Sequence, residues 1–304
     1  MRLASFIADR TARSGLVVGD EVIDLPALDP RIPADLSLVL AGGDAMRERI
    51  RAVAANAAGP RWLIEAVTLQ APVRPSKFFA VGLNYADHVA EGARERPEEL
   101  VVFAKAVSCV TGPFDPVERP IVSEQLDYEG ELGVVIGTRC RNVSRSDAPS
   151  VVGGYLALND VSVRDWQRKT PQWTLGKSFD THGPIGPWIV TPDEIADPHA
   201  LDLRTFVNGE LRQRSNTRQL LFDIWEQIKI LSTVCTLEPG DLIATGTPAG
   251  VGGAMSPPRW LVPGDVVRVE IDGIGAIENH IVQAAPQRGS GTKHVTMSSG
   301  CEGP

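Results

Sequence analysis

The feature that most constrains this chain is an acidic segment that leads directly into an apolar run. Residues 127–132 read Asp-Tyr-Glu-Gly-Glu-Leu, and residues 133–137 read Gly-Val-Val-Ile-Gly. The β-branched residues and the closing glycine are typical of a strand. Side chains two positions apart on a strand point to the same face, roughly 6–7 Å apart. The strand would therefore aim Glu129 and Glu131 at one place, which is costly unless a cation lies between them or one of them takes up a proton.

A Glu-x-Glu pattern alone indicates no more than a solvated acidic edge of a sheet, so the rest of the chain has to decide. A second apolar run, residues 155–158, ends at a third acid, Asp160, and Lys177 follows. Three carboxylates at strand ends suit a hard divalent cation that keeps positions open for other ligands. Glu129, Glu131 and Asp160 are therefore the predicted metal ligands.

Four motifs, in order along the chain, resemble those of the fumarylacetoacetate hydrolase family. They are Asp-Tyr-Glu-Gly-Glu-Leu at 127–132, Asn-Asp-Val-Ser-Val-Arg-Asp-Trp-Gln at 159–167, Gly-Lys-Ser-Phe-Asp at 176–180 and Thr-Gly-Thr-Pro-Ala-Gly-Val-Gly at 245–252. Each motif alone is weak, whereas four of them in this order and at the spacing of the family are a strong signal. The resemblance extends over residues 77–279.

The resemblance implies that Glu129, Glu131 and Asp160 hold Mg²⁺ or Mn²⁺, with water in the remaining positions. Larger fumarylacetoacetases use a fourth, upstream aspartate ligand, and the corresponding stretch of this chain lacks one. The long N-terminal domain of those enzymes is also absent, which argues against fumarylacetoacetate itself as the substrate.

Residues 83–92 are predicted to form a short helix that begins at Asn84 and ends at Gly92. His88 and Glu91 are i, i+3 neighbours on it, so the carboxylate can orient the imidazole. Taken alone, the two residues favour a surface ion pair on a marginal helix. The resemblance favours a function instead, because hydrolytic members of the family have a water-activating His-Glu pair at this place.

Four more residues are candidates for contact with substrate. Lys177 lies in an aromatic, poorly charged segment, where an ammonium group can stabilise developing enolate charge; a structural salt bridge is the alternative. Arg164 could clamp a substrate carboxylate, with Gln167 donating to its oxygens, or it could pair with Asp165 on the surface. The glycine-rich loop around Thr247 lacks the Lys-Ser/Thr end of a phosphate-binding loop. The resemblance implies that this threonine and nearby backbone N–H groups contact a substrate carboxylate.

Together these residues imply an enzyme that hydrolyses a C–C bond in an acylpyruvate or a related 2,4-diketo acid. In the implied mechanism His88, oriented by Glu91, deprotonates a water that attacks the distal carbonyl. The bond breaks to leave a pyruvate-type enolate, which the cation and Lys177 stabilise. The same site could decarboxylate oxaloacetate or isomerise a 2-hydroxy-diene-dioate, but neither reaction needs an activated water. A metal-binding scaffold without catalysis is the non-enzymatic alternative.

The composition limits the partners and the compartment. A net charge of −8 argues against a nucleic-acid or anionic-membrane partner, which would require a basic face. No apolar run is long enough to span a bilayer, and residues 1–4 start no signal peptide. The four cysteines lack Cys-x-x-Cys spacing and so suggest neither a zinc site nor a disulfide framework. A cytoplasmic enzyme with a small keto-acid substrate is the simplest interpretation, and the resemblance implies a homodimer.

The order of strand and turn signals predicts a mainly β fold with some helix, of the α+β class. Residues 1–72 are predicted to form a small β-rich domain, followed by a Pro-rich linker. Residues 73–283 are predicted to form a sandwich-like β roll with few helices, which the resemblance identifies as the fumarylacetoacetase C-terminal type. The polar, glycine-rich tail, residues 284–304, is expected to be disordered.

Local signals add detail to both parts. The dipeptides at 19–20 and 208–209 predict turns between paired strands. Apolar spacing predicts helices over about 37–58 and 220–231. His182, in a Thr-His-Gly-Pro segment, is expected to be a loop or core histidine.

Overall fold

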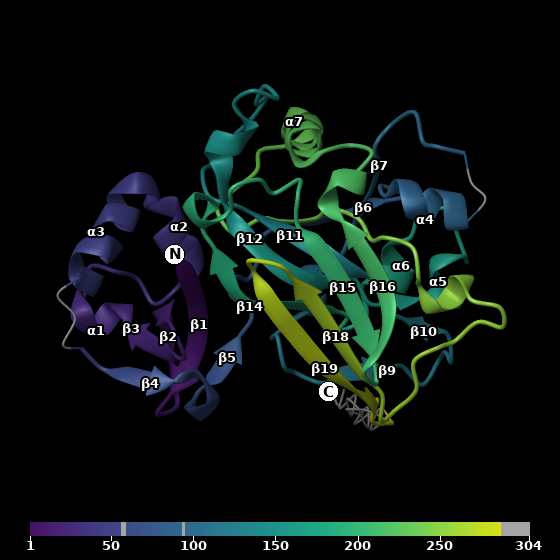
Figure 1. The fold of residues 1–304 in the computed structure, drawn as a ribbon, viewed down its shortest axis with the longest axis horizontal. Coiled ribbons are helices and arrows are strands. Elements are labelled where there is room, and N and C mark those ends of the chain that lie inside the picture. The colour runs from purple at the N-terminus through teal and green to yellow at the C-terminus, as the bar shows by residue number, and fades with distance from the viewer. Residues whose placement is uncertain (56–58, 93–94, 287–304) are drawn as a thin grey trace, which may run out of the picture.

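The computed structural model describes residues 1–55, 59–92 and 95–286. Its architecture is mainly β with some helix, which confirms the predicted fold class (Figure 1). A large sheet runs through the molecule in the strand order β4 (Arg61–Leu63), β3 (Glu21–Asp24), β2 (Thr11–Val18), β1 (Arg2–Ala8), β14 (Gly183–Val190), β12 (Val152–Asn159), β11 (Gly130–Ile136), β17 (Leu242–Ala244), β6 (Phe78–Gly82) and β7 (Val101–Ala104). Two short strands join it from the side, β5 (Thr68–Gln70) on β1 and β8 (Val110–Thr111) on β14.

A second sheet packs against the large one, and short helices surround both. Its strand order is β16 (Glu210–Asn216), β15 (Asp202–Val207), β18 (Val266–Ile271), β19 (Gly275–Gln283) and β9 (Val117–Arg119), and β10 (Leu126–Asp127) pairs separately with β13 (Ser162–Val163). The α-helices are α1 (Leu25–Leu28), α2 (Leu36–Ala41), α3 (Gly43–Ala55), α4 (Ala86–Glu91), α5 (Arg164–Gln167), α6 (Thr174–Lys177) and α7 (Ile224–Val234). Short 3₁₀ turns lie at η1 (Ile64–Ala66), η2 (Val107–Cys109), η3 (Ala148–Val151), η4 (Pro192–Glu194), η5 (Thr217–Gln219) and η6 (Gly252–Ala254).

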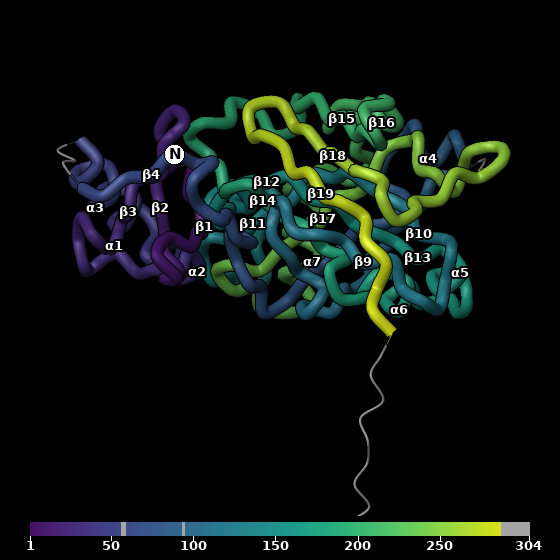
Figure 2. Tube along the Cα trace, turned by 90° about the horizontal axis from the view of Figure 1, so that it is seen from below, coloured from purple at the N-terminus to yellow at the C-terminus, as the bar shows by residue number. Residues whose placement is uncertain are grey.

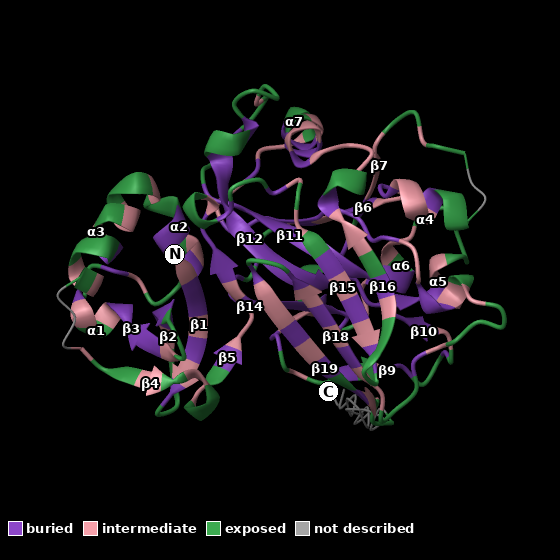
Figure 3. Cartoon of the chain, in the orientation of Figure 1, coloured by how far each residue is buried: buried purple, intermediate pink, exposed green. Residues whose placement is uncertain are grey.

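Strand β11 is buried on both faces, because a different core lies on each side of it (Figure 3). Leu132, Val134 and Ile136 face the core shared with the second sheet and α7. Val135 faces the opposite core, which α1, α2 and α3 help to cover. A strand between two cores is apolar at nearly every position rather than at alternate ones. The acidic residues at its start, Glu129 and Glu131, are also buried.

The N-terminal segment is continuous with the rest through the large sheet. β1 pairs antiparallel with β14, placing Arg2 opposite Val190, and the two parts lie side by side in both views (Figures 1 and 2). Leu3 shares a core with Ile189 of β14. The two parts on either side of the boundary predicted near residue 72 therefore share one sheet and one core.

The local predictions differ from the structure mainly at helix ends. The turns at 19–20 and 208–209 join β2 to β3 and β15 to β16, as predicted. The helix predicted over 37–58 is two helices, which separate where Gly43 has a φ of +56°; residues 56–58 lie outside the described part. The helix predicted from 220 begins only after Asp223, whose side chain accepts a bond from Glu226 N at 2.9 Å as the N-cap.

Two further predictions concern the chain end and membranes. Residues 287–304, most of the tail expected to be disordered, lie outside the described residues. Among the helices that the structure describes, none has the length and apolar character needed to cross a membrane.

Candidate active site

The three predicted metal ligands meet where β11 begins and β12 ends. Glu129 precedes β11, Glu131 is its second residue, and Asp160 directly follows β12. Asp160 N donates to Glu129 O at 2.8 Å, so the strand pairing itself sets their spacing. One carboxylate oxygen from each residue lies within 4.8 Å of the others, and all three side chains are buried. The structure thus brings this set together as predicted.

Two buried lysines hold the carboxylates from the side. Lys177 Nζ donates to Glu129 Oε2 and to Asp160 Oδ2, each at 2.6 Å. Lys105 Nζ donates to Asp160 Oδ1, also at 2.6 Å. Both oxygens of Asp160 therefore have a fixed cationic partner, and its carboxylate cannot rotate freely.

Arg164 completes the cluster from α5 and is buried rather than exposed. Its Nε donates to Asp127 Oδ2 at 2.8 Å, and its Nη1 donates to Glu129 Oε1 at 2.6 Å and to Gln167 Oε1 at 3.0 Å. The alternative of a surface pair with Asp165 is therefore wrong, because the guanidinium group is turned inward to two other carboxylates. Gln167 lies at the same place and lines the cavity described below.

The charges of the cluster fit a bound divalent cation. Its four carboxylates face three cations, which leaves one negative charge in excess if all are ionised. Burial, together with the charges of Asp160 and Glu129, raises the pKa of Glu131 well above its usual range. Although burial opposes it, the charges of Lys177 and Arg164 hold the pKa of Glu129 well below its usual range. A divalent cation would stabilise the ionised form of Glu131, and the hard oxygen donors match such an ion.

Helix α4 differs from the prediction at its start. Tyr85 rather than Asn84 is the N-cap residue, while Gly92 is the C-cap as predicted. The Asn84 side chain instead donates to Thr245 O at 2.7 Å and accepts from Phe222 N at 2.9 Å. A buried amide that both donates and accepts can join two chain segments, whereas an N-cap side chain only accepts. Asn84 thus fixes α4 to the glycine-rich loop.

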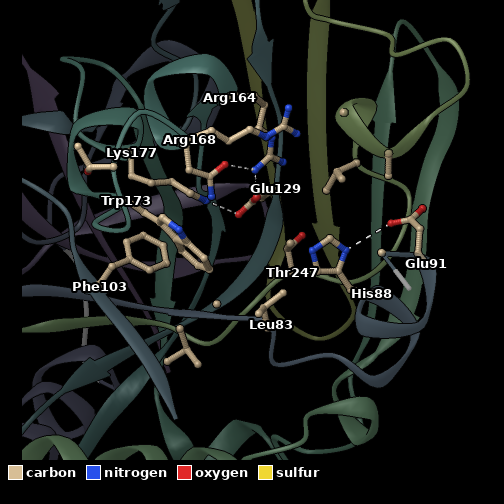
Figure 4. A pocket seen from close by; sticks show the side chains of 18 residues that line it. Leu83, His88, Glu91, Phe103, Glu129, Arg164, Arg168, Trp173, Lys177 and Thr247 are labelled. Carbon is tan, nitrogen blue, oxygen red and sulfur yellow. Dashed lines mark hydrogen bonds and ion pairs between the residues drawn. The ribbon is translucent and has the colours of Figure 1, made fainter. Parts of the chain in front are cut away.

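His88 and Glu91 lie on α4, on one side of the cavity (Figure 4). His88 Nδ1 is 3.3 Å from Glu91 Oε2, so the predicted pair is present, at a long distance. Glu91 Oε1 also accepts from Gly250 N at 2.9 Å, which ties the pair to the glycine-rich loop. The neighbouring Asp87 accepts from the hydroxyl of Ser215 at 2.6 Å. The position of the imidazole is therefore set by contacts with two other segments.

The glycine-rich loop is bound to the acidic segment at both of its ends. Gly246 N donates to Glu131 Oε2 at 2.7 Å. Gly246 has a φ of +112°, a conformation that L side chains rarely adopt. At the other end, Gly252 N and Gly253 N donate to the two oxygens of Asp127, at 2.8 and 2.9 Å. The loop and the acidic segment are thus held together by hydrogen bonds at both ends of the loop.

The Thr247 hydroxyl has a defined direction because of Gln213. Gln213 Oε1 accepts from Gly130 N at 2.9 Å, so its Nε2 must donate to Thr247 Oγ1 at 2.8 Å and to Pro248 O at 2.9 Å. The threonine proton then goes to Gly130 O at 3.0 Å. The sequence analysis predicted that the Thr247 hydroxyl contacts a substrate carboxylate. Such a carboxylate would have to compete with Gly130 O for the hydroxyl proton.

A cavity of about 380 Å³ connects these groups (Figure 4). The predicted site residues on its wall are His88, Glu91, Glu129, Arg164, Gln167, Lys177 and Thr247. Glu131 and Asp160 lie behind this wall and are 1% and 0% exposed. The wall also includes Phe103 and Trp173, whose rings pack edge to face at 5.5 Å. The site is therefore a mixed polar and aromatic pocket with the acidic cluster at one end.

Sequence reasoning missed three residues of the site. Lys105 follows an apolar strand, and a lysine in such a run was the available signal. Asp127 was part of a recognised motif, but nothing in the spacing showed that it would bind the far end of the glycine-rich loop. Gln213 had no signal, because it is one polar residue among several in a hairpin.

Comparison with known proteins identifies the family. Residues 77–282 match the family model described as fumarylacetoacetate (FAA) hydrolase C-terminal. The chain belongs to the fumarylacetoacetate hydrolase family.

Individual relatives of the chain catalyse different reactions. The Bos taurus protein named oxaloacetate tautomerase FAHD2B, mitochondrial, is 44% identical over 289 residues, which are 93% of this chain and 92% of that protein. The structure of maleylpyruvate hydrolase from Sphingobium sp. SYK-6 in complex with manganese(II) ion and pyruvate is 37% identical, with a TM-score of 0.79 over 94% of this chain and 100% of that one. The structure of 5-carboxymethyl-2-hydroxymuconate delta-isomerase from Mycobacterium smegmatis is 37% identical, with a TM-score of 0.77 over 93% and 100%. The family therefore supports an enzyme, and the Mn(II) complex together with the acidic cluster supports a divalent metal site.

Proposed function

We propose that this protein is a metal-dependent enzyme that interconverts the keto and enol forms of a 2-oxo acid of the oxaloacetate type. The observation that carries this proposal is that His88, Glu91 and Glu129 line one cavity, with Glu131 and Asp160 buried next to Glu129. A proton-transfer group thus faces the place where a 2-oxo acid would be held. Several relatives that match nearly the whole chain have the printed name oxaloacetate tautomerase, which supports this reaction.

Mg²⁺ or Mn²⁺ is the proposed cofactor, and Glu129, Glu131 and Asp160 are the residues that would hold it. A divalent cation at this place supplies a Lewis acid that polarises a 2-oxo group. Lys177 adds a fixed positive charge at the same end of the cavity, 2.6 Å from two of the carboxylates. Preorganised positive charge lowers the energy of an enolate.

His88 is the proposed acid–base group. Tautomerisation moves a proton between the carbon beside the keto group and the solvent or the enol oxygen. With Glu91 accepting from Nδ1–H, the other ring nitrogen is left to take the carbon-bound proton and to return it. Because Glu91 is itself anchored by Gly250 N, the imidazole is held in one orientation.

Hydrolysis of a C–C bond in an acylpyruvate or 2,4-diketo acid, which the sequence favours, is the second candidate. In that reaction His88 removes a proton from water, and the water attacks the distal carbonyl. One observation favours it: the related maleylpyruvate hydrolase has been solved with manganese and pyruvate, and pyruvate is the keto acid that cleavage of an acylpyruvate releases. The decarboxylase and diene-dioate isomerase alternatives require no activated water.

A single experiment separates the two candidates. The Mn²⁺-loaded protein is given enol-oxaloacetate, with loss of enol absorbance as the readout, and separately a panel of acylpyruvates, with pyruvate release as the readout. Rapid enol loss without pyruvate release supports tautomerisation, and the reverse result supports hydrolysis. If neither occurs, both proposals fail.

The His88→Ala variant tests the assigned base. The rate of the active reaction should fall roughly 10²- to 10⁴-fold, as expected for loss of a positioned general base. Mn²⁺ affinity, measured by calorimetry, should stay unchanged because His88 is not a proposed ligand. His280→Ala, an exposed histidine on β19, is the matched control. A near wild-type rate in His88→Ala would move the base elsewhere.

A homodimer and a cytoplasmic location remain proposals for this chain. The first is tested by the mass of the purified protein in light scattering. The second is tested by fractionating cells that express the full chain, and the word mitochondrial in the names of several relatives is the competing outcome.

A further inference from the structure

Three cationic side chains line the cavity, and two of them are already paired. Lys177 bonds to Glu129 and Asp160. Arg164 bonds to Asp127 through Nε and to Glu129 through Nη1, while its buried Nη2 has no hydrogen-bond partner among the described residues. The third cation, Arg168, is exposed and has no carboxylate within ion-pair distance among the residues that the structure describes. It is an unneutralised positive charge at the cavity wall.

The backbone presents Arg168 from a fixed position. Arg168 is the C-cap of α5, and its N–H donates to Arg164 O at 3.1 Å. Gly176 of α6 packs so closely on this helix that a Cβ there would lie 2.2 Å from Gln167 N. The contact locks α5 against α6, which carries Lys177. The backbone at Arg168 is therefore fixed relative to the helix that carries Lys177.

The two arginines and the His88–Glu91 pair lie on different sides of the cavity. Arg164 and Arg168 lie on one side of it, and His88 and Glu91 lie on another (Figure 4). Glu91 is itself engaged, since its two oxygens contact His88 and Gly250. It therefore leaves the charge of Arg168 available to an anionic ligand.

We propose that Arg168 binds a second carboxylate of the substrate and thereby selects dicarboxylic 2-oxo acids over monocarboxylic ones. The inference rests on the proposed function, in which the 2-oxo acid end of the substrate lies at the acidic cluster. A guanidinium group donates two parallel hydrogen bonds to a carboxylate, which suits it to this recognition. Among the described residues of the cavity wall, the other two cations, Lys177 and Arg164, already pair with protein carboxylates.

Ligand binding tests this without turnover. Pyruvate, a monocarboxylate, and 2-oxoglutarate, a 2-oxo dicarboxylate, are titrated into the Mn²⁺-loaded protein in a calorimeter. Arg168→Gln should weaken 2-oxoglutarate binding roughly 10- to 100-fold, as expected for loss of a charged hydrogen-bond partner. Pyruvate binding should change by less than about twofold, because it has no second carboxylate. Arg168→Lys should recover part of the lost affinity.

Lys169→Gln is the matched control. It removes the same charge from the next residue, whose ammonium lies 3.2 Å from the centre of the Trp166 ring. Both ligands should bind this variant as they bind the wild type. The proposal is overturned if Arg168→Gln weakens both ligands equally or neither, if Lys169→Gln has the same effect, or if wild-type protein does not bind 2-oxoglutarate.

Turnover separates failure of this subsite from failure of the proposed function. The ratio of kcat/KM for substrates with and without a terminal carboxylate is compared between wild type and Arg168→Gln, with the change expected mainly in KM. If no 2-oxo acid is turned over but binding still depends on Arg168, the subsite stands and the proposed reactions fall. If turnover occurs with a ratio that Arg168→Gln leaves unchanged, the reaction stands and the subsite is wrong.

Discussion

Glu129 and Glu131 lie two residues apart at one strand end, yet their surroundings act on them in opposite ways. Glu129 accepts bonds from Lys177 and Arg164, which stabilise its charge. The described hydrogen bond of the Glu131 carboxylate is a neutral one, from Gly246 N. Two carboxylates of the same strand end can therefore have different roles: one is stabilised as an anion by protein cations, and the other needs an added cation.

The first prediction at this scale concerns Glu131 in metal-free protein. The pKa of the Glu131 carboxyl in the folded protein is raised above the ordinary value of 4.5. The contribution of this group to the free energy of unfolding is therefore fully present below pH 4.5, and it is lost as pH rises through the pKa of the folded protein. Metal-free Glu131→Gln should therefore lose less stability than wild type as pH is raised to 8, and the substitution should abolish Mn²⁺ binding. Thermal unfolding in chelator from pH 5 to 8.5, with Mn²⁺ titrations, measures both effects.

Glu129→Gln is the control for this prediction, because it removes a carboxylate that two cations stabilise. It should destabilise metal-free protein at the same pH. Retained Mn²⁺ affinity in Glu131→Gln would contradict the ligand assignment.

The second prediction at this scale concerns His182, which is a buried core histidine as the sequence suggested. Burial lowers its pKa from 6.5 to about 4, and its Nε2 lies 2.9 Å from Glu118 O. The unfolded chain therefore takes up the proton first, so stability is lost as pH falls from the unfolded pKa towards the folded one. The loss from this group should be roughly 3 kcal/mol in all.

His182→Gln keeps a donor for Glu118 O but cannot be protonated. Urea unfolding at pH 7 and pH 4.5 should show a smaller acid-induced loss of stability in this variant than in wild type. Equal losses in the two proteins would mean that other groups control the acid response.

At the scale of elements, the site depends on contacts between segments rather than on any one of them. Gly130 of β11, which separates the predicted metal ligands Glu129 and Glu131, has its N–H bonded to Gln213 of β16 and its C=O bonded to Thr247 of the glycine-rich loop. A Cβ on Gly130 would lie 2.1 Å from Thr205 Oγ1, so no side chain fits there without rearrangement. The backbone of Gly130 thus joins β11, β16 and the glycine-rich loop.

This contact predicts that Gln213 controls metal affinity from a distance. Gln213→Leu leaves Gly130 N and Pro248 O without their partner, at a cost of about 1–3 kcal/mol for each buried group. Mn²⁺ affinity should fall with stability, because Gly130 separates Glu129 from Glu131. Calorimetry and urea unfolding measure the two effects.

Gln213→Glu tests the donor half of the same contact. It keeps an acceptor for Gly130 N, but an ionised carboxylate would face Pro248 O and Thr247 Oγ1 without a proton to donate, so stability and Mn²⁺ affinity should both fall. Arg214→Ala, at the next and exposed position of β16, is the control. Unchanged Mn²⁺ affinity in a folded Gln213→Leu protein would limit this residue to a structural role.

At the scale of the whole molecule, the N-terminal strands and helices complete the main sheet. They cover the β14 edge through β1 and close the core that contains Leu156, Leu158 and Ile189. Loss of this cover would expose an unpaired strand edge beside an apolar surface, which favours aggregation.

We therefore predict that a fragment of residues 73–304 does not fold stably alone. It should aggregate or lack the near-UV circular dichroism of the full chain. Leu3→Asp, which places a charge in the shared core, should lower the unfolding temperature of the full chain. A monodisperse fragment with native-like near-UV signal and Mn²⁺ affinity would show that the two parts fold independently.

The sequence by itself determined the features that depend on neighbouring residues. The two-residue period of a strand placed Glu129 and Glu131 on one face, and turn dipeptides located the hairpins. The four motifs identified the family and predicted the ligand set. These signals are short-range, because backbone geometry relates residues only a few positions apart in a fixed way.

Only the tertiary structure decided which distant side chains meet. It turned Arg164 inward to Asp127, placed Lys105 on Asp160, and used Gln213 to direct the hydroxyl of Thr247. It also joined the N-terminal strands to the main sheet through β1 and β14. Each of these contacts depends on sheet pairing between remote segments. Whether a polar side chain is buried and bonded, or exposed and without an ionic partner among the described residues like Arg168, is set by that pairing and not by its sequence neighbours.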